Sequence, residues 1–265
     1  MSICSDGTSI NLLDSLGGTP TAGGTWNGPS AVAGGMYDPA TMTPGAYVYT
    51  VVGTAPCANA AATVTVNEVA PADAGTDASL TVCDQGAAAS LLSALGGTPD
   101  VGGIWSGPSA VVNDQYDPAT MDPGAYVYTV VGTAPCGSAS ATVTVSETGS
   151  PDAGIDGSLT VCADGAPVDL FTSLGGSPDG GGSWSGPSVL AGGLFDPGSD
   201  QGGVYTYTLS ATAPCMGDQS QVTVTVAPAP DAGIDAGLTV CDQGAATSLL
   251  SALGGTPDVG GIWSG

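Results

Sequence analysis

One stretch of this chain occurs twice and sets the period of everything else. Residues 80–107, LTVCDQGAAASLLSALGGTPDVGGIWSG, return at residues 238–265 with a single change, Thr247 in place of Ala89. The two copies start two periods of 79 apart, and looser copies begin at Ser2 and Leu159. The chain therefore consists of tandem copies of one unit. We place these units at residues 1–72, 73–151 and 152–230, followed by a partial unit at residues 231–265.

The charge balance excludes several classes of function. The chain has no Lys, Arg or His and carries 24 acidic residues, for a net charge of −24. Without basic side chains, the chain cannot neutralise the phosphates of nucleic acid or of an anionic lipid surface. Because 42% of the residues are hydrophobic and the mean hydropathy is +0.26, we expect a folded chain rather than a disordered one. The longest apolar runs are far too short for a transmembrane helix, so we expect no membrane insertion.

The seven cysteines follow the same period in two series. Cys4, Cys83, Cys162 and Cys241 form one series, and Cys57, Cys136 and Cys215 form the other. We predict one disulfide in each repeat, joining Cys4 to Cys57, Cys83 to Cys136 and Cys162 to Cys215. Pairing between neighbouring units, such as Cys57 with Cys83, is an alternative. The sequence contains no CxxC motif of the kind that forms zinc sites. Disulfides indicate an oxidising, extracellular location.

The local patterns predict an all-β fold. Residues 122–130 alternate tyrosine and valine as a half-buried strand does, and residues 139–145 supply a return strand, with Cys136 at the bend between them. The spacing Asp-x-Gly-x-Tyr resembles the tyrosine corner of immunoglobulin-like sandwiches. Leu91, Leu92 and Leu95 fit either a helical turn or a bulged strand. Because a large aromatic side chain can cap a small core, we expect packing roles for all four periodic tryptophans: Trp26, Trp105, Trp184 and Trp263.

The order of the motifs carries a family resemblance. VCDxG, LGGTP or LGGSP, GGxWSGP, YDPAT, GxYxYTV, GTAPC, ATVTV and PDAGxD follow one another along nearly the whole chain. In this the chain resembles the tandem immunoglobulin-like repeats of very large secreted or surface proteins of Bacteroidota. The resemblance implies β-sandwich units, export, and a role in adhesion or extracellular filaments, with no catalytic residues. The complete loss of Lys and Arg departs from what we expect of such repeats.

Calcium is the ion that the acidic side chains are best suited to bind. Hard cations prefer carboxylate and carbonyl oxygens, and an Asp pair four residues apart opens each later unit: Asp73 with Asp77, Asp152 with Asp156, and Asp231 with Asp235. These segments are rich in proline, which indicates short, stiff joints between units. The competing interpretation is that each Asp serves a local turn. We therefore expect no required cofactor, with Ca²⁺ as the one candidate.

These features favour a structural protein over an enzyme. We expect an extracellular filament, fibre or cell-surface stalk whose partners are copies of itself, end to end or laterally. The alternative is a cell-surface adhesin array that binds glycans or partner cells through its aromatic side chains. The segment Asp14-Ser15-Leu16 resembles a Bacteroidota O-glycosylation pattern. Since Cys241 lacks a partner 53 positions further on, we also expect these residues to be a window on a longer repetitive polypeptide.

Overall fold

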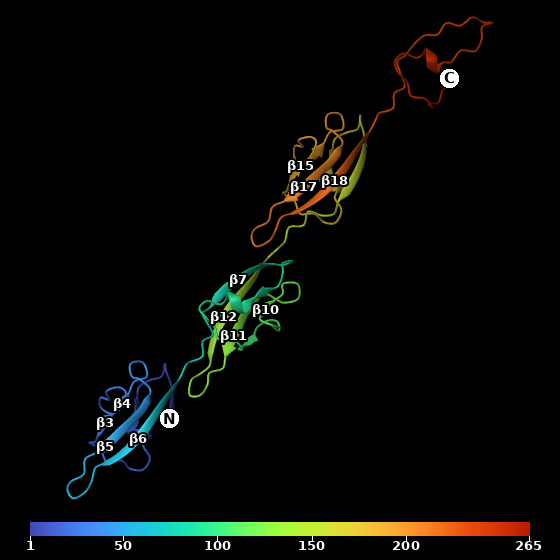
Figure 1. Ribbon diagram of the computed structural model, residues 1–265. Coiled ribbons are helices and arrows are strands. Elements are labelled where there is room, and N and C mark those ends of the chain that lie inside the picture. Colours follow the sequence, from blue (N-terminus) through green and yellow to red (C-terminus); the bar gives the residue numbers. More distant parts are fainter. The chain divides into compact units, whose positions relative to one another are not determined.

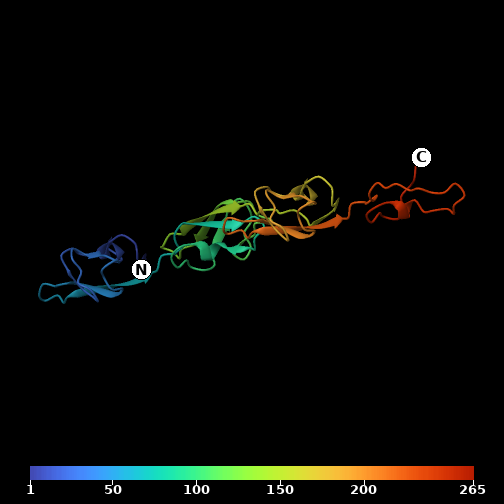
Figure 2. The same ribbon diagram turned by 90° about the horizontal axis from the view of Figure 1, so that it is seen from above.

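The computed structural model describes all 265 residues, most of them in strands and the turns between strands. The chain forms two compact units: residues 1–149 together with 213–215, and residues 150–212 together with 216–265. Its helices are single turns, and none could cross a membrane. The three complete repeats can be followed by colour in Figures 1 and 2, from blue through green to orange.

Each complete repeat contains the same elements in the same order. The first has β1 (Ser2–Cys4), β2 (Ile10–Asn11), η1 (Leu12–Ser15), β3 (Thr25–Asn27), β4 (Met36–Tyr37), β5 (Gly45–Val51) and β6 (Ala60–Val69). The second has β7 (Ala78–Cys83), β8 (Ala89–Ser90), α1 (Leu91–Ala94), β9 (Ile104–Ser106), β10 (Gln115–Tyr116), β11 (Gly124–Val130) and β12 (Ala139–Thr148). The third has β13 (Gly157–Cys162), β14 (Val168–Asp169), η2 (Leu170–Ser173), β15 (Ser183–Ser185), β16 (Leu194–Phe195), β17 (Gly203–Leu209) and β18 (Asp218–Ala227). The partial unit has only η3 (Leu250–Ala252).

A four-stranded sheet and a two-stranded ladder make up each complete repeat. In the second repeat the sheet order is β7-β12-β11-β9, and β8 pairs with β10 in the ladder. The first strand runs parallel to the last, from Ala78 beside Val143 to Cys83 beside Thr148, whereas all other pairs are antiparallel. The predicted hairpin is confirmed as β11 and β12, and the leucine-rich segment is a helical turn, α1.

A tyrosine corner confirms the predicted fold class. The hydroxyl of Tyr126, near the start of β11, donates a hydrogen bond to the carbonyl of Asp122 at 2.6 Å. Tyr47 and Tyr205 bind the carbonyls four residues upstream in the same way. Together with the strand order, this feature identifies each complete repeat as an immunoglobulin-like β-sandwich.

The core repeats residue by residue with the 79-residue period. In the second repeat it centres on side chains that are 3% exposed or less: Leu91, Tyr116, Tyr126, Tyr128, Val143 and Val145. Tyr116 and Tyr126 meet edge to face, with ring centroids 5.6 Å apart, an arrangement that suits the quadrupoles of aromatic rings. The counterparts in the other repeats are buried in the same way, with Phe195 in the place of Tyr116.

The tryptophans lie at the edge of this core rather than in it. Trp26, Trp105 and Trp184 are partly buried, and each packs on the second tyrosine of the following hairpin strand at 4.9–5.1 Å between ring centroids. The expectation of a core role is wrong for Trp263, which is 55% exposed. The partial unit contains no hairpin that could supply the tyrosine covering the other three.

The segments expected to be joints belong to the repeats that follow them. Ala74 and Ala153 are buried in the cores of the second and third repeats. The Thr76 N–H donates to the Gly96 carbonyl, and the Gly96 N–H donates back to the carbonyl of Thr76. Ile155 and Gly175 form the same pair in the third repeat, so these contacts fix the start of the second and third repeats against their own LGGTP or LGGSP turns.

The glycine of the WSGP or WNGP motif makes room for the corner tyrosine. A Cβ atom added at Gly186 would lie well inside contact distance of Cδ1 of Tyr205. The Tyr205 ring cannot move aside easily, because its hydroxyl is hydrogen-bonded to Gln201 and its ring packs on Phe195. By contrast, a Cβ added at Gly180 would meet nothing within 4 Å.

We predict that Gly186→Ala destabilises the third repeat by about 1–3 kcal/mol, because overpacking forces the tyrosine or the backbone to shift. Gly180→Ala, in the same repeat, should change stability by less than about 0.5 kcal/mol. Native-state hydrogen exchange of the β17 amides measures both effects. Equal protection in the two variants would contradict the steric argument.

The only two glutamates of the chain serve one purpose. Glu68 and Glu147 accept hydrogen bonds from the buried hydroxyls of Tyr37 and Tyr116, at 2.6 and 2.5 Å. In the third repeat the tyrosine becomes Phe195 and the glutamate position becomes Val226, so the polar pair is replaced as a unit. Burial, reinforced by the glutamate hydrogen bond, raises the pKa of both tyrosines well above the usual range.

These raised pKa values predict a loss of stability in alkali. The folded chain keeps its tyrosine protons at a pH where the unfolded chain has lost them, so stability is intact below about pH 10 and falls as the pH rises above it. Replacing Tyr37 and Tyr116 with Phe, and Glu68 and Glu147 with Val, should reduce this loss of stability at high pH. Urea unfolding of both chains at neutral and alkaline pH measures it, and the same decline in both would count against the assignment.

Candidate functional site: disulfides between repeats

The disulfides join neighbouring repeats, not the two cysteines of one repeat. Cys4 is bonded to Cys136, and Cys83 is bonded to Cys215. The sequence separation is 132 in both pairs, which is the predicted 53 plus one period of 79. In each pair a cysteine at the end of a first strand meets the hairpin bend of the next repeat. The predicted bonds Cys4–Cys57, Cys83–Cys136 and Cys162–Cys215 are therefore wrong. The alternative of pairing between neighbouring units is confirmed, but its example, Cys57 with Cys83, is wrong.

Strand direction explains why the predicted pairing fails. Because β1 is parallel to β6, Cys4 lies beside Val69 at the far end of that strand. Cys57 comes before β6, whose first residue is Ala60. The length of β6 therefore separates the two sulfurs, about 30 Å for a ten-residue strand. A disulfide requires Cα atoms within about 7 Å of each other, and Cys4 and Cys136 meet this limit at 5.0 Å.

Three cysteines carry free thiols: Cys57 and Cys241, which are exposed, and Cys162, which is partly buried. At the separation seen in the two bonds, the partner position of each of the three falls outside the chain described here. The pattern of bonded and free cysteines therefore follows one rule throughout.

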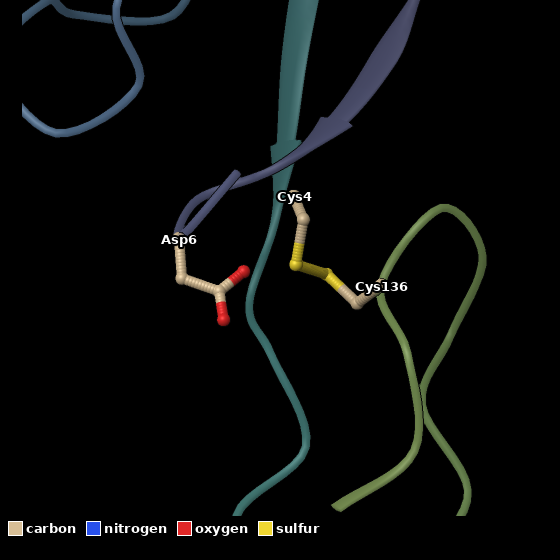
Figure 3. Close-up of side chains that lie close together, drawn as sticks. All are labelled: Cys4, Asp6 and Cys136. Carbon is tan, nitrogen blue, oxygen red and sulfur yellow. A yellow bond between two sulfur atoms is a disulfide. The ribbon is translucent and has the colours of Figure 1, made fainter. Parts of the chain in front are cut away.

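A carboxylate lies beside each bridge. Figure 3 shows Asp6, in the turn after β1, close to the sulfurs of Cys4 and Cys136. The potential ligand atoms of these three residues lie within 4.8 Å of one another, as do those of Cys83, Asp84 and Cys215. Oxidised sulfurs are not thiolate ligands, so the bonded state does not form a metal centre.

The Asp pairs that we expected to bind calcium accept hydrogen bonds from backbone N–H groups. Asp73 accepts a hydrogen bond from Gly75, whereas Asp77 accepts one from Thr142 on β12. In the third repeat, Asp152 and Asp156 likewise accept hydrogen bonds from the backbone N–H groups of Gly154 and Gln221. In the partial unit, Asp231 accepts one from the Gly233 N–H. Asp235 completes the third pair in sequence. Within the second and third repeats, the two carboxylates of a pair thus serve different backbone amides. Calcium binding at these pairs stays a prediction.

Comparison with known proteins finds distant likenesses among solved structures. No protein-family model matches the chain, and no curated protein matches it. Among solved structures, an I-band fragment of titin, I67–I69, is 15% identical, with a TM-score of 0.39 over 69% of this chain and 75% of that one. Extracellular domains 3–5 of Drosophila OTK are 13% identical, with a TM-score of 0.34 over 69% of this chain and 71% of that one. Scores this low carry no argument about function.

The bonding pattern predicts which cysteines react with a thiol reagent. Alkylation of the unreduced chain should label Cys57 and Cys241, and Cys162 once the chain is unfolded, while the other four stay protected. Because the chain has no Lys or Arg, trypsin has no site in it, and peptides must come from cleavage at Asp or with pepsin. Mass spectrometry should then find Cys4 linked to Cys136. A peptide linking Cys4 to Cys57 would contradict the structure.

Proposed function

We propose that this chain is a structural component of an extracellular filament, fibre or stalk, in which disulfides carry tension past folded repeats. The observation that supports the proposal is the bonding of one repeat to the next. A disulfide inside one repeat would stabilise only that repeat. A disulfide between consecutive repeats also joins the two repeats to each other, so that tension passes directly from one to the next.

The change of pairing has little effect on the entropy of loop closure. In the chain-entropy model, closing a loop depends on the logarithm of its length. Enlarging the loop from about 53 to 132 residues therefore adds less than about 1 kcal/mol. Compared with the chain without disulfides, the two bonds change the covalent path far more. The route from Cys4 to Cys215 through both disulfides uses only the backbone between Cys83 and Cys136.

The fully stretched lengths differ accordingly. At the maximum extension of a polypeptide, the backbone from Cys4 to Cys215 reaches about 730 Å, and the part from Cys83 to Cys136 only about 180 Å. Under tension, the segments between Cys4 and Cys83 and between Cys136 and Cys215 stay slack, because the bridges bypass them. While the bonds hold, the load therefore does not run through most of the first repeat, nor through the third repeat up to Cys215.

The disulfides and the charge of the chain bear on its location and partners. Disulfides persist in oxidising compartments, which supports an extracellular or surface location. The absence of basic residues removes trypsin-like cleavage sites, which suits an exposed fibre. Copies of the chain, end to end or laterally, remain the proposed partners, and like charge would keep them apart unless cations screen it. The proposal assigns no catalytic role to any residue.

Single-molecule stretching between the two termini tests the mechanical role. The reduced chain should reach a contour length about 550 Å greater than the oxidised chain, because the bridges take two slack segments out of the oxidised path. Cys136→Ser, which keeps only the Cys83–Cys215 bond, should restore about 90 Å of that length. Equal contour lengths before and after reduction would refute the proposed route of tension.

A further inference from the structure

The first and third repeats contain the same surface hollow beside their tryptophan. In the third repeat it has a volume of about 460 Å³, and in the first about 450 Å³. Every residue that lines the hollow in the first repeat has its counterpart, two periods further on, in the lining of the third. Volumes of this size are typical of sites for small ligands. Since the two hollows are lined by matching positions, they arise from the same local structure in both repeats.

The walls of each hollow combine aromatic rings with polar atoms. In the third repeat Trp184 packs against Tyr207, with ring centroids 5.1 Å apart, and Phe171 packs on the same tyrosine. Asp169 contributes a carboxylate, of which one oxygen accepts a hydrogen bond from the Phe171 N–H. In the first repeat Asn11 takes the place of Asp169, and its side-chain oxygen accepts from Leu13.

The second repeat fills this place with its own side chain. Asp114 accepts a hydrogen bond from the indole N–H of Trp105 at 2.8 Å. The corresponding residues, Gly35 and Gly193, have no side chain, and the indole N–H groups of Trp26 and Trp184 have no hydrogen-bond partner in the chain. Both glycines line the hollows, so the unused N–H groups lie at their edge.

Backbone conformation shows that the difference is built into the loop. Asn113 and Asp114 have φ values of 52° and 58°, in the left-handed region that residues other than glycine seldom adopt. The matching positions in the other two repeats are Gly34-Gly35 and Gly192-Gly193, also at positive φ. The loop shape is therefore kept in all three repeats, and only the side chain that satisfies the indole changes.

We propose that the hollows beside Trp26 and Trp184 bind a neutral, hydroxyl-bearing ligand, a saccharide, and that Asp114 closes the equivalent position in the second repeat. A hydroxyl group can accept from the indole N–H and donate to the oxygen of Asn11 or Asp169. The aromatic faces suit the C–H face of a sugar ring. An anion would meet Asp169 in a chain of charge −24 that has no basic side chain, and a cation would leave the indole N–H unpaired. This inference is independent of the proposed mechanical function.

The indole N–H resonances test the proposal within one molecule. In ¹⁵N-labelled chain, neutral glucan and mannan oligosaccharides at millimolar concentration should shift the signals of Trp26 and Trp184 until they saturate, and leave Trp105 in place. Glucuronate and tetramethylammonium serve as the anionic and cationic probes. The proposal fails if no neutral oligosaccharide moves the two signals, if only a charged probe does, or if Trp105 responds equally.

Two matched variants exchange the loops. Asn113→Gly with Asp114→Gly should open the second repeat, so that the Trp105 signal responds to the same sugars. Gly34→Asn with Gly35→Asp should abolish the response of Trp26, while Trp184 in the same chain still responds and shows that the sugar is active. Unchanged backbone amide signals of β5 and β11 confirm that the variants fold. A Trp26 response that survives closure would overturn the assignment.

Discussion

In each complete repeat the first strand runs parallel to the last, and this pairing dictates the covalent structure. It places the strand cysteine at the end of the long hairpin strand, where one repeat gives way to the next, and leaves the hairpin cysteine at the opposite end. A bond within the repeat is then out of reach, whereas the bend of the following repeat is close. The direction of the first strand therefore determines that each disulfide joins two consecutive repeats and does not close within one repeat.

Stability is achieved here without ion pairs between side chains. The core depends on tyrosines whose rings pack on one another and whose hydroxyls are all hydrogen-bonded, to backbone carbonyls or to glutamate. Many aspartates accept hydrogen bonds from backbone amides in turns, where a carboxylate fits the local N–H groups. The excess negative charge is thereby spread over turns and edges, and the buried layers remain apolar or fully paired.

Differences between the repeats reveal which positions act together. Tyr116 and Glu147 are exchanged as a pair for Phe195 and Val226, since a buried hydroxyl without its acceptor would destabilise the core. Asn113 and Asp114 replace two glycines without changing the loop, since asparagine and aspartate tolerate left-handed backbone better than other side chains. The first exchange preserves the core, whereas the second supplies a surface side chain that pairs with the indole N–H of Trp105.

Repetition of long stretches was enough to predict the period, and alternation and spacing within a few residues were enough to predict the all-β character, the hairpin around Cys136 and the tyrosine corner. The pairing of the cysteines was not predictable in this way, since it depends on whether β7 runs parallel or antiparallel to β12, and local patterns do not specify that direction. No local pattern predicts the hollows beside Trp26 and Trp184 either, although the exchange of Gly-Gly for Asn-Asp is visible when the repeats are aligned. Both features arise from contacts between segments that are separate in the sequence. The lining of the hollow in the third repeat runs from Asp169 to Tyr207, and the strand cysteine of one repeat meets the hairpin of the next.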